Sequence, residues 1–159
     1  MTLWIGSAGD RMRTQMIGAR FYATLAVAVV LTFIVHEAAH WMAGVGLGYE
    51  MQMRINGGVP IAPPGTAVTA RDAFIISAAG PVATALQAIL AFALIRTRGS
   101  LPAYAFLFVA WFMRFAAAFV SMFNPNDEAR MSVQLGWNMW LLPGVVVSIL
   151  LLLTWAGAR

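Results

Sequence analysis

The chain has 159 residues, of which 61% are hydrophobic and only 10% are charged. Soluble domains carry about 25% charged residues, so this composition excludes an ordinary soluble domain and indicates that a lipid bilayer surrounds most of the protein. The net charge of +4 comes from arginines scattered along the chain, which argues against nucleic-acid binding. The absence of cysteine excludes disulfides, thiolate metal ligands and cysteine nucleophiles.

Four apolar stretches are long enough to cross a bilayer, which requires about 20 residues. We predict membrane spans over about residues 21–43, 73–95, 101–123 and 139–156. The basic segment 1–20 forms a leader before the first span. The sequence therefore predicts an all-α membrane protein with four transmembrane helices.

The connection between the first and second spans has the pattern of a strand pair. Residues 51–56 alternate between apolar and polar side chains, and an Asn-Gly-Gly turn follows them. Pro60 would confine the second strand to an edge. We predict a short β-hairpin-like segment over about residues 51–61, and an irregular loop is the alternative.

Both histidines of the chain lie near the end of the first span, in His36-Glu37-Ala38-Ala39-His40. Residues four apart lie on nearly the same face of a helix, so the two imidazoles can bind one metal ion. Glu37 is placed to take a proton from water that the metal activates. Ionisable groups within a span cost at least about 2.5 kcal/mol each and are usually functional. This HExxH arrangement favours a Zn²⁺ site over histidines that are merely packed and hydrogen-bonded.

A catalytic zinc ion usually has three protein ligands, and here the third must be a carboxylate. The candidates are Glu50, Asp72, Asp127, Glu128 and, remotely, Asp10. The third span runs in the same direction as the first and is broken by Asn124-Pro125. This break would bring Asp127 or Glu128 to the depth of the histidines, although a solvated cluster at the helix end would show the same pattern.

Three motifs, in this order, resemble the site-2 protease family of intramembrane zinc metalloproteases. His36–His40 is similar to the zinc-binding motif of the family, and residues 79–84 are similar to its Gly-Pro-x-x-Asn element. Asn124-Pro125-Asn126-Asp127 is similar to its Asn-Pro-x-Asp-Gly element. The resemblance covers about residues 21–130, the three-helix core of the family, and leaves out the fourth span in 131–159.

The resemblance implies a zinc metalloendopeptidase that hydrolyses transmembrane or membrane-proximal peptide bonds. It implies that Zn²⁺ is bound by His36, His40 and Asp127, and that Glu37 is the general base. Glu128, which departs from the family pattern, is an alternative ligand to Asp127. A transmembrane protein would be its substrate or its partner subunit.

The resemblance also implies that the strand segment pairs with an unwound substrate. Met53, Arg54, Ile55 and Asn124 are then the candidate substrate-binding residues. Arg114 lies well inside the third span and has two interpretations. It forms a structural ion pair with Glu37, Asp127 or Glu128, or it contacts the substrate.

Two residues depart from the family pattern. Thr84 stands where the family has asparagine, and Glu128 stands where it has glycine. Both departures leave open a second interpretation, a catalytically inactive site-2-protease-like membrane scaffold or accessory subunit of a larger complex.

The orientation in the membrane receives two contradictory predictions. With four spans, six arginines face the side of both termini and three face the side of the metal site, so the positive-inside rule makes the side of the termini cytoplasmic. The family resemblance instead makes the metal site cytosolic. We expect a bacterial inner (cytoplasmic) membrane, with the metal site near its cytosolic face.

Overall fold

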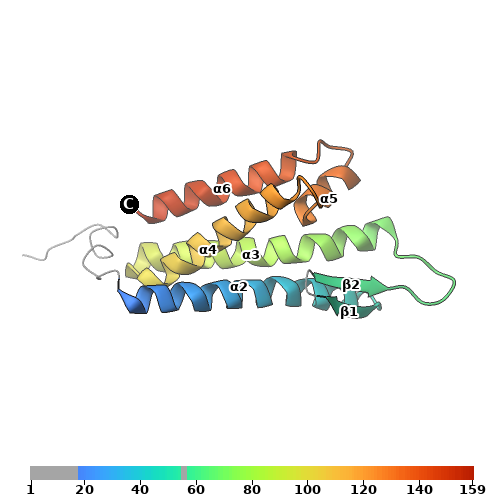
Figure 1. The fold of residues 1–159 in the computed structure, drawn as a ribbon, viewed down its shortest axis with the longest axis horizontal. Helices are drawn as coiled ribbons and strands as arrows, with labels where there is room; N and C mark the ends of the chain where they lie inside the picture. Colours follow the sequence, from blue (N-terminus) through green and yellow to red (C-terminus); the bar gives the residue numbers. More distant parts are fainter. Residues whose placement is uncertain (1–17, 55–56) are drawn as a thin grey trace, which may run out of the picture.

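A computed structural model describes residues 18–54 and 57–159. Ile55 and most of the predicted leader, residues 1–17, lie outside the described residues. Four long helices run alongside one another, and a short helix and a β-hairpin lie at one end of them (Figure 1). The elements are α2 (Ala19–Gly46), β1 (Glu50–Arg54), β2 (Gly57–Ile61), α3 (Ala70–Arg98), α4 (Leu101–Val120), α5 (Asp127–Gln134) and α6 (Leu141–Gly157).

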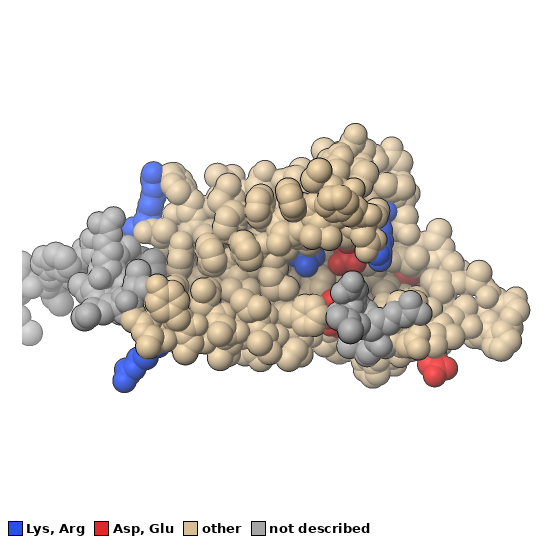
Figure 2. Space-filling model, viewed as in Figure 1, with Lys and Arg blue, Asp and Glu red and all other residues tan. Residues whose placement is uncertain are grey.

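The two ends of this bundle differ in charge and are named accordingly. The hairpin end contains β1, β2 and α5 (Figure 1). The arginine end contains Arg20, Arg96, Arg98 and Arg159. On the face in Figure 2, charged side chains gather toward the two ends, and acidic and basic groups lie together in a hollow nearer the hairpin end.

Within the described residues, three helices are long and apolar enough to cross a membrane, namely α2, α3 and α4 with 28, 29 and 20 residues. Many of their valine, leucine, isoleucine and phenylalanine side chains are exposed, as expected of a surface that faces lipid. These helices are compatible with an integral membrane protein. The fourth predicted span corresponds to α6, which has 17 residues and is shorter than the other three long helices, so the fourth span stays a prediction.

Small side chains allow the long helices to approach closely toward the arginine end. One buried cluster joins α3, α4 and α6 through Ala88, Ala91, Ile95, Ala103, Leu107, Ala110 and Leu150. A second joins α2 to α4 through Ala28, Ala105 and Val109. Gly99 ends α3 in the left-handed conformation, with φ of 60°, and Ser100 accepts a hydrogen bond from Ala103 N–H to begin α4.

The predicted hairpin is confirmed. Strands β1 and β2 pair antiparallel in a register that runs from Glu50 opposite Ile61 to Arg54 opposite Gly57. Among the described residues the sheet has two strands, so Pro60 lies on an edge as expected. The side chain of Met51 occupies the space that a Cβ on Gly44 would enter, and this contact seats the hairpin against the end of α2.

The connection between the third and fourth predicted spans contains the short helix α5, which the sequence analysis did not predict. Asn126 caps this helix by accepting a hydrogen bond of 2.9 Å from Ala129 N–H. Asp127 and Glu128 occupy its first turn, where the helix dipole favours negative charge. The preceding helix α4 ends at Val120, three residues before the predicted end of its span.

Candidate metal centre

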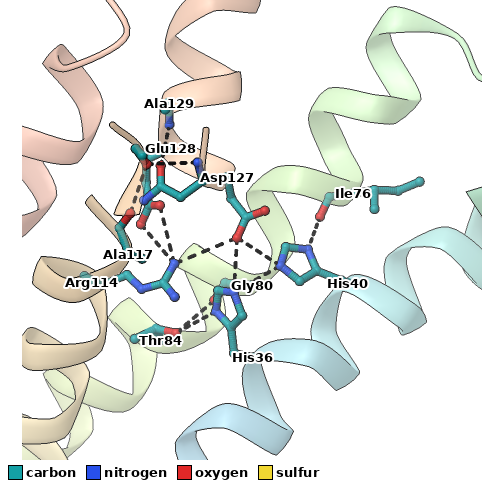
Figure 3. A network of polar contacts seen from close by, with 12 residues as sticks. His36, His40, Ile76, Gly80, Thr84, Arg114, Ala117, Asp127, Glu128 and Ala129 are labelled. Carbon is teal, nitrogen blue, oxygen red and sulfur yellow. Dashed lines mark hydrogen bonds and ion pairs between the residues drawn. The ribbon is translucent and has the colours of Figure 1, made fainter. Parts of the chain in front are cut away.

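Three potential metal ligands from α2 and α5 meet at the hairpin end (Figure 3). Asp127 Oδ2 lies 3.2 Å from His36 Nε2 and 3.3 Å from His40 Nε2, and the two Nε2 atoms are 3.1 Å apart. Both histidines are buried, and Asp127 is half-buried. Among the described residues, this is the group of histidine and acidic side chains that could hold a metal ion.

Helix α3 fixes the orientation of both imidazoles through their other nitrogen. His40 Nδ1 lies 2.6 Å from the carbonyl oxygen of Ile76, which can only accept, so this nitrogen carries the hydrogen. His36 Nδ1 lies 3.0 Å from Thr84 Oγ1, whose hydroxyl donates to the carbonyl of Gly80. His36 Nδ1 is therefore also the donor. In a neutral imidazole, each Nε2 then points a lone pair at the other ligand atoms.

Two imidazole lone pairs and a carboxylate oxygen that converge in this way are suited to bind a shared cation. With metal–ligand distances of about 2.0–2.1 Å, the corners of a tetrahedral zinc site lie about 3.3 Å apart. The three edges of the observed triangle are 3.1, 3.2 and 3.3 Å. Both the chemistry of the ligands and their spacing therefore fit a tetrahedral zinc ion, with one corner left for water or substrate.

Gly80 allows α3 to lie directly against the two histidines. A Cβ at this position would lie 2.6 Å from His36 Nε2 and closer still to His40 Nε2. Real Cβ contacts are never this short, and both imidazoles are held by hydrogen bonds. The Gly-Pro element thus contributes a backbone without a side chain at the point of closest approach.

Negative charge predominates around the candidate centre. Asp127 contributes one carboxylate to the triangle of candidate ligands. Glu37 and Glu128 add two further carboxylates, and Arg114 supplies the one guanidinium that pairs with them among the described residues. A divalent cation would offset the formal excess of negative charge.

Glu37 lies beside the candidate ligands but does not belong to the triangle. Its Oε2 atom is buried and has no hydrogen-bond partner among the described residues. Glu37 also lines both cavities that reach Asp127. Glu37 thus lies at the wall of both cavities and has one carboxylate oxygen that no described residue engages.

Arg114 and Glu128 form a buried ion pair next to the metal ligands. Arg114 Nη1 lies 3.2 Å from Glu128 Oε1 and 3.9 Å from Asp127 Oδ2. The pair ties α4 to the first turn of α5. The structure thus places Asp127, rather than Glu128, against the histidines. Of the three acidic partners that the sequence left open for Arg114, Glu128 is the nearer and Asp127 is the second.

The other carboxylates considered as ligands have different surroundings. Asp72 accepts a hydrogen bond of 2.7 Å from the hydroxyl of Tyr49, and this bond raises the pKa of Tyr49. Glu50 is exposed at the start of β1. Asp10 lies outside the described residues. Neither Asp72 nor Glu50 belongs to the group that could hold a metal.

Two cavities reach the candidate centre. The hairpin cavity, about 430 Å³, is lined by β2, α2, α3 and α5. The α2–α4 cavity, about 410 Å³, lies between α2 and α4. Both are lined by Glu37, Asn124, Asp127 and Arg130. Asn124 thus lies where a substrate contact was predicted. Met53 and Arg54 belong to β1, but their side chains lie outside the described part of the chain, as does Ile55.

The sequence analysis missed three contributions to this site. The carbonyl of Ile76 has no signature in sequence because every residue has one. Thr84 was expected to lie with Gly80 on a stripe of small residues that packs against the metal site, but its contact with His36 was not predicted. The capping role of Asn126 could have been read from the Asn-Asp-Glu sequence that begins α5.

Comparisons with protein-family models, with curated proteins and with solved structures found no match.

Proposed function

We propose that this chain is an intramembrane zinc metalloprotease that hydrolyses transmembrane or membrane-proximal peptide bonds. The observation that carries the proposal is the convergence of His36, His40 and Asp127 beside the unpartnered carboxylate oxygen of Glu37. Metal ligands and a free base in adjacent positions are what metal-assisted hydrolysis requires. The three motifs that resemble the site-2 protease family give the same interpretation.

In this proposal, some residues of the chain hold the metal and another transfers a proton. Zinc would polarise the scissile carbonyl and lower the pKa of a water molecule. Glu37 would accept the proton of the attacking water and deliver it to the leaving amine. Thr84 and the carbonyl of Ile76 would keep both imidazoles in the tautomer that leaves Nε2 free to bind.

A transmembrane substrate would have to unwind before cleavage, because a helix hides its peptide bonds in its own hydrogen bonds. The hairpin borders one of the cavities through Gly58, Val59 and Pro60. A free edge of this two-stranded sheet could pair with the unwound segment as an added strand. This pairing would replace the hydrogen bonds that the substrate helix loses.

Metal analysis and cleavage by the purified and expressed chain test the proposal. We expect about one zinc per chain in the wild type and in Glu37→Gln, and none in His36→Ala. Labelling of new protein N-termini in membranes should reveal fragments, cut within apolar segments, that depend on the wild-type chain and disappear with Glu37→Gln. Glu50→Gln, a change to an exposed glutamate at the same end, should behave as the wild type.

Two results would contradict the proposal. A chain that binds no stoichiometric metal, and whose His36→Ala variant folds unchanged, would instead be the inactive scaffold or accessory subunit. A chain that binds zinc but produces the same N-termini as Glu37→Gln would be a metal-binding protein without this protease activity.

A further inference from the structure

Three residues that line the α2–α4 cavity each carry an unpartnered buried polar atom. Among the described residues, four buried side-chain nitrogen or oxygen atoms lack a hydrogen-bond partner: Glu37 Oε2, Arg114 Nε, Asn126 Nδ2 and Trp111 Nε1. The first three belong to residues that line this one cavity, whereas Trp111 does not line it. Such atoms are rare in native proteins, so three around one cavity indicate that water or a ligand satisfies them.

The two donors among these atoms are held in place by the other polar atoms of their own side chains. Arg114 Nη1 donates to Glu128 Oε1 at 3.2 Å. Asn126 Oδ1 accepts from Ala129 N–H at 2.9 Å, and the backbone N–H of Asn126 donates to Ser121 Oγ at 2.9 Å. Each side chain is thus anchored and keeps one N–H group to spare, which is a preorganised arrangement for binding.

The chemistry of the cavity selects a neutral ligand with both polar and apolar parts. Two donors require acceptors from the ligand, and Glu37 Oε2 requires a donor. The lining contains Glu37 and Asp127 together with Arg114 and Arg130, so its formal charges cancel and do not favour a phosphate or carboxylate group. A lipid chain would leave all three atoms unsatisfied. Phe33, Phe112, Met113 and Val120 form an apolar part of the wall, which suits aliphatic or aromatic side chains.

We propose that Arg114 and Asn126 bind backbone carbonyl groups of an extended, apolar peptide segment in the α2–α4 cavity. An extended peptide carries carbonyl acceptors and N–H donors that are not used within its own chain, so it matches the three free atoms. The volume of about 410 Å³ suits a segment of a few residues. This inference rests on the proposed protease function and names the part of the site that would hold the substrate backbone.

The test uses a leucine pseudopeptide with uncharged ends, in which a phosphinic group replaces the central peptide bond. When this group binds the metal, leucine residues extend to both sides of it. Analogues replace each carbonyl in turn by an alkene of the same shape. Calorimetry on the full-length, zinc-loaded chain in detergent measures binding. We expect at least one replacement to weaken binding to the wild type roughly 10- to 100-fold, as expected for a hydrogen bond to a charged or anchored donor.

Two variants each remove one spare donor and keep the structural contact of the same side chain. Arg114→Lys retains a cation for Glu128, and Asn126→Ser retains an oxygen that can cap α5. Each variant should bind about one zinc per chain, like the wild type. Each should bind the parent pseudopeptide at least roughly tenfold more weakly than the wild type does. The alkene analogue that weakens binding to the wild type should lower the affinity of the variant little further. Arg98→Lys, at the arginine end, is the matched control and should behave as the wild type.

The possible failures are distinguishable. If every alkene analogue binds the wild type as tightly as the parent, or if each replacement weakens binding equally in the wild type and both variants, the carbonyl-binding role is wrong while the zinc site stands. If the variants lose zinc together with the pseudopeptide, Arg114 and Asn126 have a structural role only. If the wild type itself binds neither zinc nor pseudopeptide, the proposed function fails, and this inference fails with it.

Discussion

The helices contact one another through different kinds of side chain at the two ends of the bundle. Toward the arginine end, α3, α4 and α6 meet through alanine, isoleucine and leucine side chains. At the hairpin end, helices meet through imidazole, carboxylate and guanidinium groups. Apolar contacts are evidently sufficient to join these helices, and buried charges are costly within a membrane. The polar end is therefore better explained by a ligand than by the needs of folding.

The largest effect should come from breaking the buried ion pair at the hairpin end. Arg114→Met leaves Glu128 as an unpaired charge with only 2% of its surface exposed, and such a change costs about 3–5 kcal/mol. The arginine end provides the control, because Arg98 is exposed and Arg98→Met should change stability by less than about 0.5 kcal/mol. Denaturation of both variants in mixed micelles measures the difference.

A double variant separates charge from packing in the same experiment. Arg114→Met with Glu128→Met removes both charges and should recover much of the lost stability, since apolar replacements of buried pairs are often tolerated. Equal stability of the Arg114→Met and Arg98→Met chains would show that the buried ion pair at the hairpin end contributes no more to stability than an exposed arginine at the other end.

Two glycines, one near each end, provide the second comparison. A Cβ at Gly80 would collide with ring atoms of His36 and His40, whereas a Cβ at Gly157 would meet Leu107 Cδ2 at 3.1 Å and Ile95 Cδ1 at 3.3 Å. Terminal methyl groups can shift by a few tenths of an ångström, but the hydrogen-bonded imidazoles cannot. We expect Gly80→Ala to weaken zinc binding at least about 100-fold, as the loss of ligand geometry predicts.

Gly157→Ala should retain zinc and change the free energy of unfolding by less than about 1 kcal/mol, because the gain in helix propensity opposes the tighter packing. Competition with a chromophoric chelator gives both zinc affinities. Zinc binding that survives unchanged in Gly80→Ala would mean that α3 does not need to touch the histidines.

These contrasts also separate what the sequence could predict from what it could not. The helices at residues 19–46 and 70–98 and the hairpin follow from hydropathy and alternation, which are local patterns. His36 and His40 were recognisable because their spacing alone places them on one helix face. The choice between Asp127 and Glu128 was not local, because it depends on the direction in which α5 begins after the break at Asn124-Pro125.

The sequence likewise could not identify the partners of buried charged groups. Arg114 had three acidic candidates, and only the packing of α4 against α5 distinguishes them. The helix α5 itself has eight residues, fewer than the roughly 11–18 over which helical periodicity is recognised in a sequence. The last apolar stretch was predicted to span the membrane from composition, but the helix it forms has 17 residues.

Thr84 tests whether the departure from the family pattern is a functional replacement. Thr84→Val keeps the shape of the side chain but removes the oxygen that lies 3.0 Å from His36 Nδ1. Loss of such an outer contact typically weakens metal binding about 10- to 100-fold. Thr84→Ser restores the hydroxyl and should recover most of the zinc affinity, as measured by chelator competition. Equal affinities of the valine and serine variants would show that the hydroxyl does not orient the imidazole.

The smallest effect concerns a polar contact between the two ends. Gln87 Nε2 donates a hydrogen bond of 2.7 Å to Thr32 Oγ1 and links α3 to α2. Hydrogen bonds between membrane helices contribute about 0.6 kcal/mol on average and at most about 1.7 kcal/mol. A double-mutant cycle with Gln87→Leu and Thr32→Val, followed by denaturation in mixed micelles, should give a coupling in this range and leave zinc affinity unchanged.

The zinc affinities measured in this cycle show whether the Gln87–Thr32 contact belongs to the polar region around the metal site. A coupling seen only in stability would mark Gln87 and Thr32 as ordinary packing groups, so that the functional polar region stops at Thr84 and His36. A fall in zinc affinity in either single variant would extend that region by about one helical turn toward the arginine end, because Thr32 precedes His36 by four residues on the same face of α2.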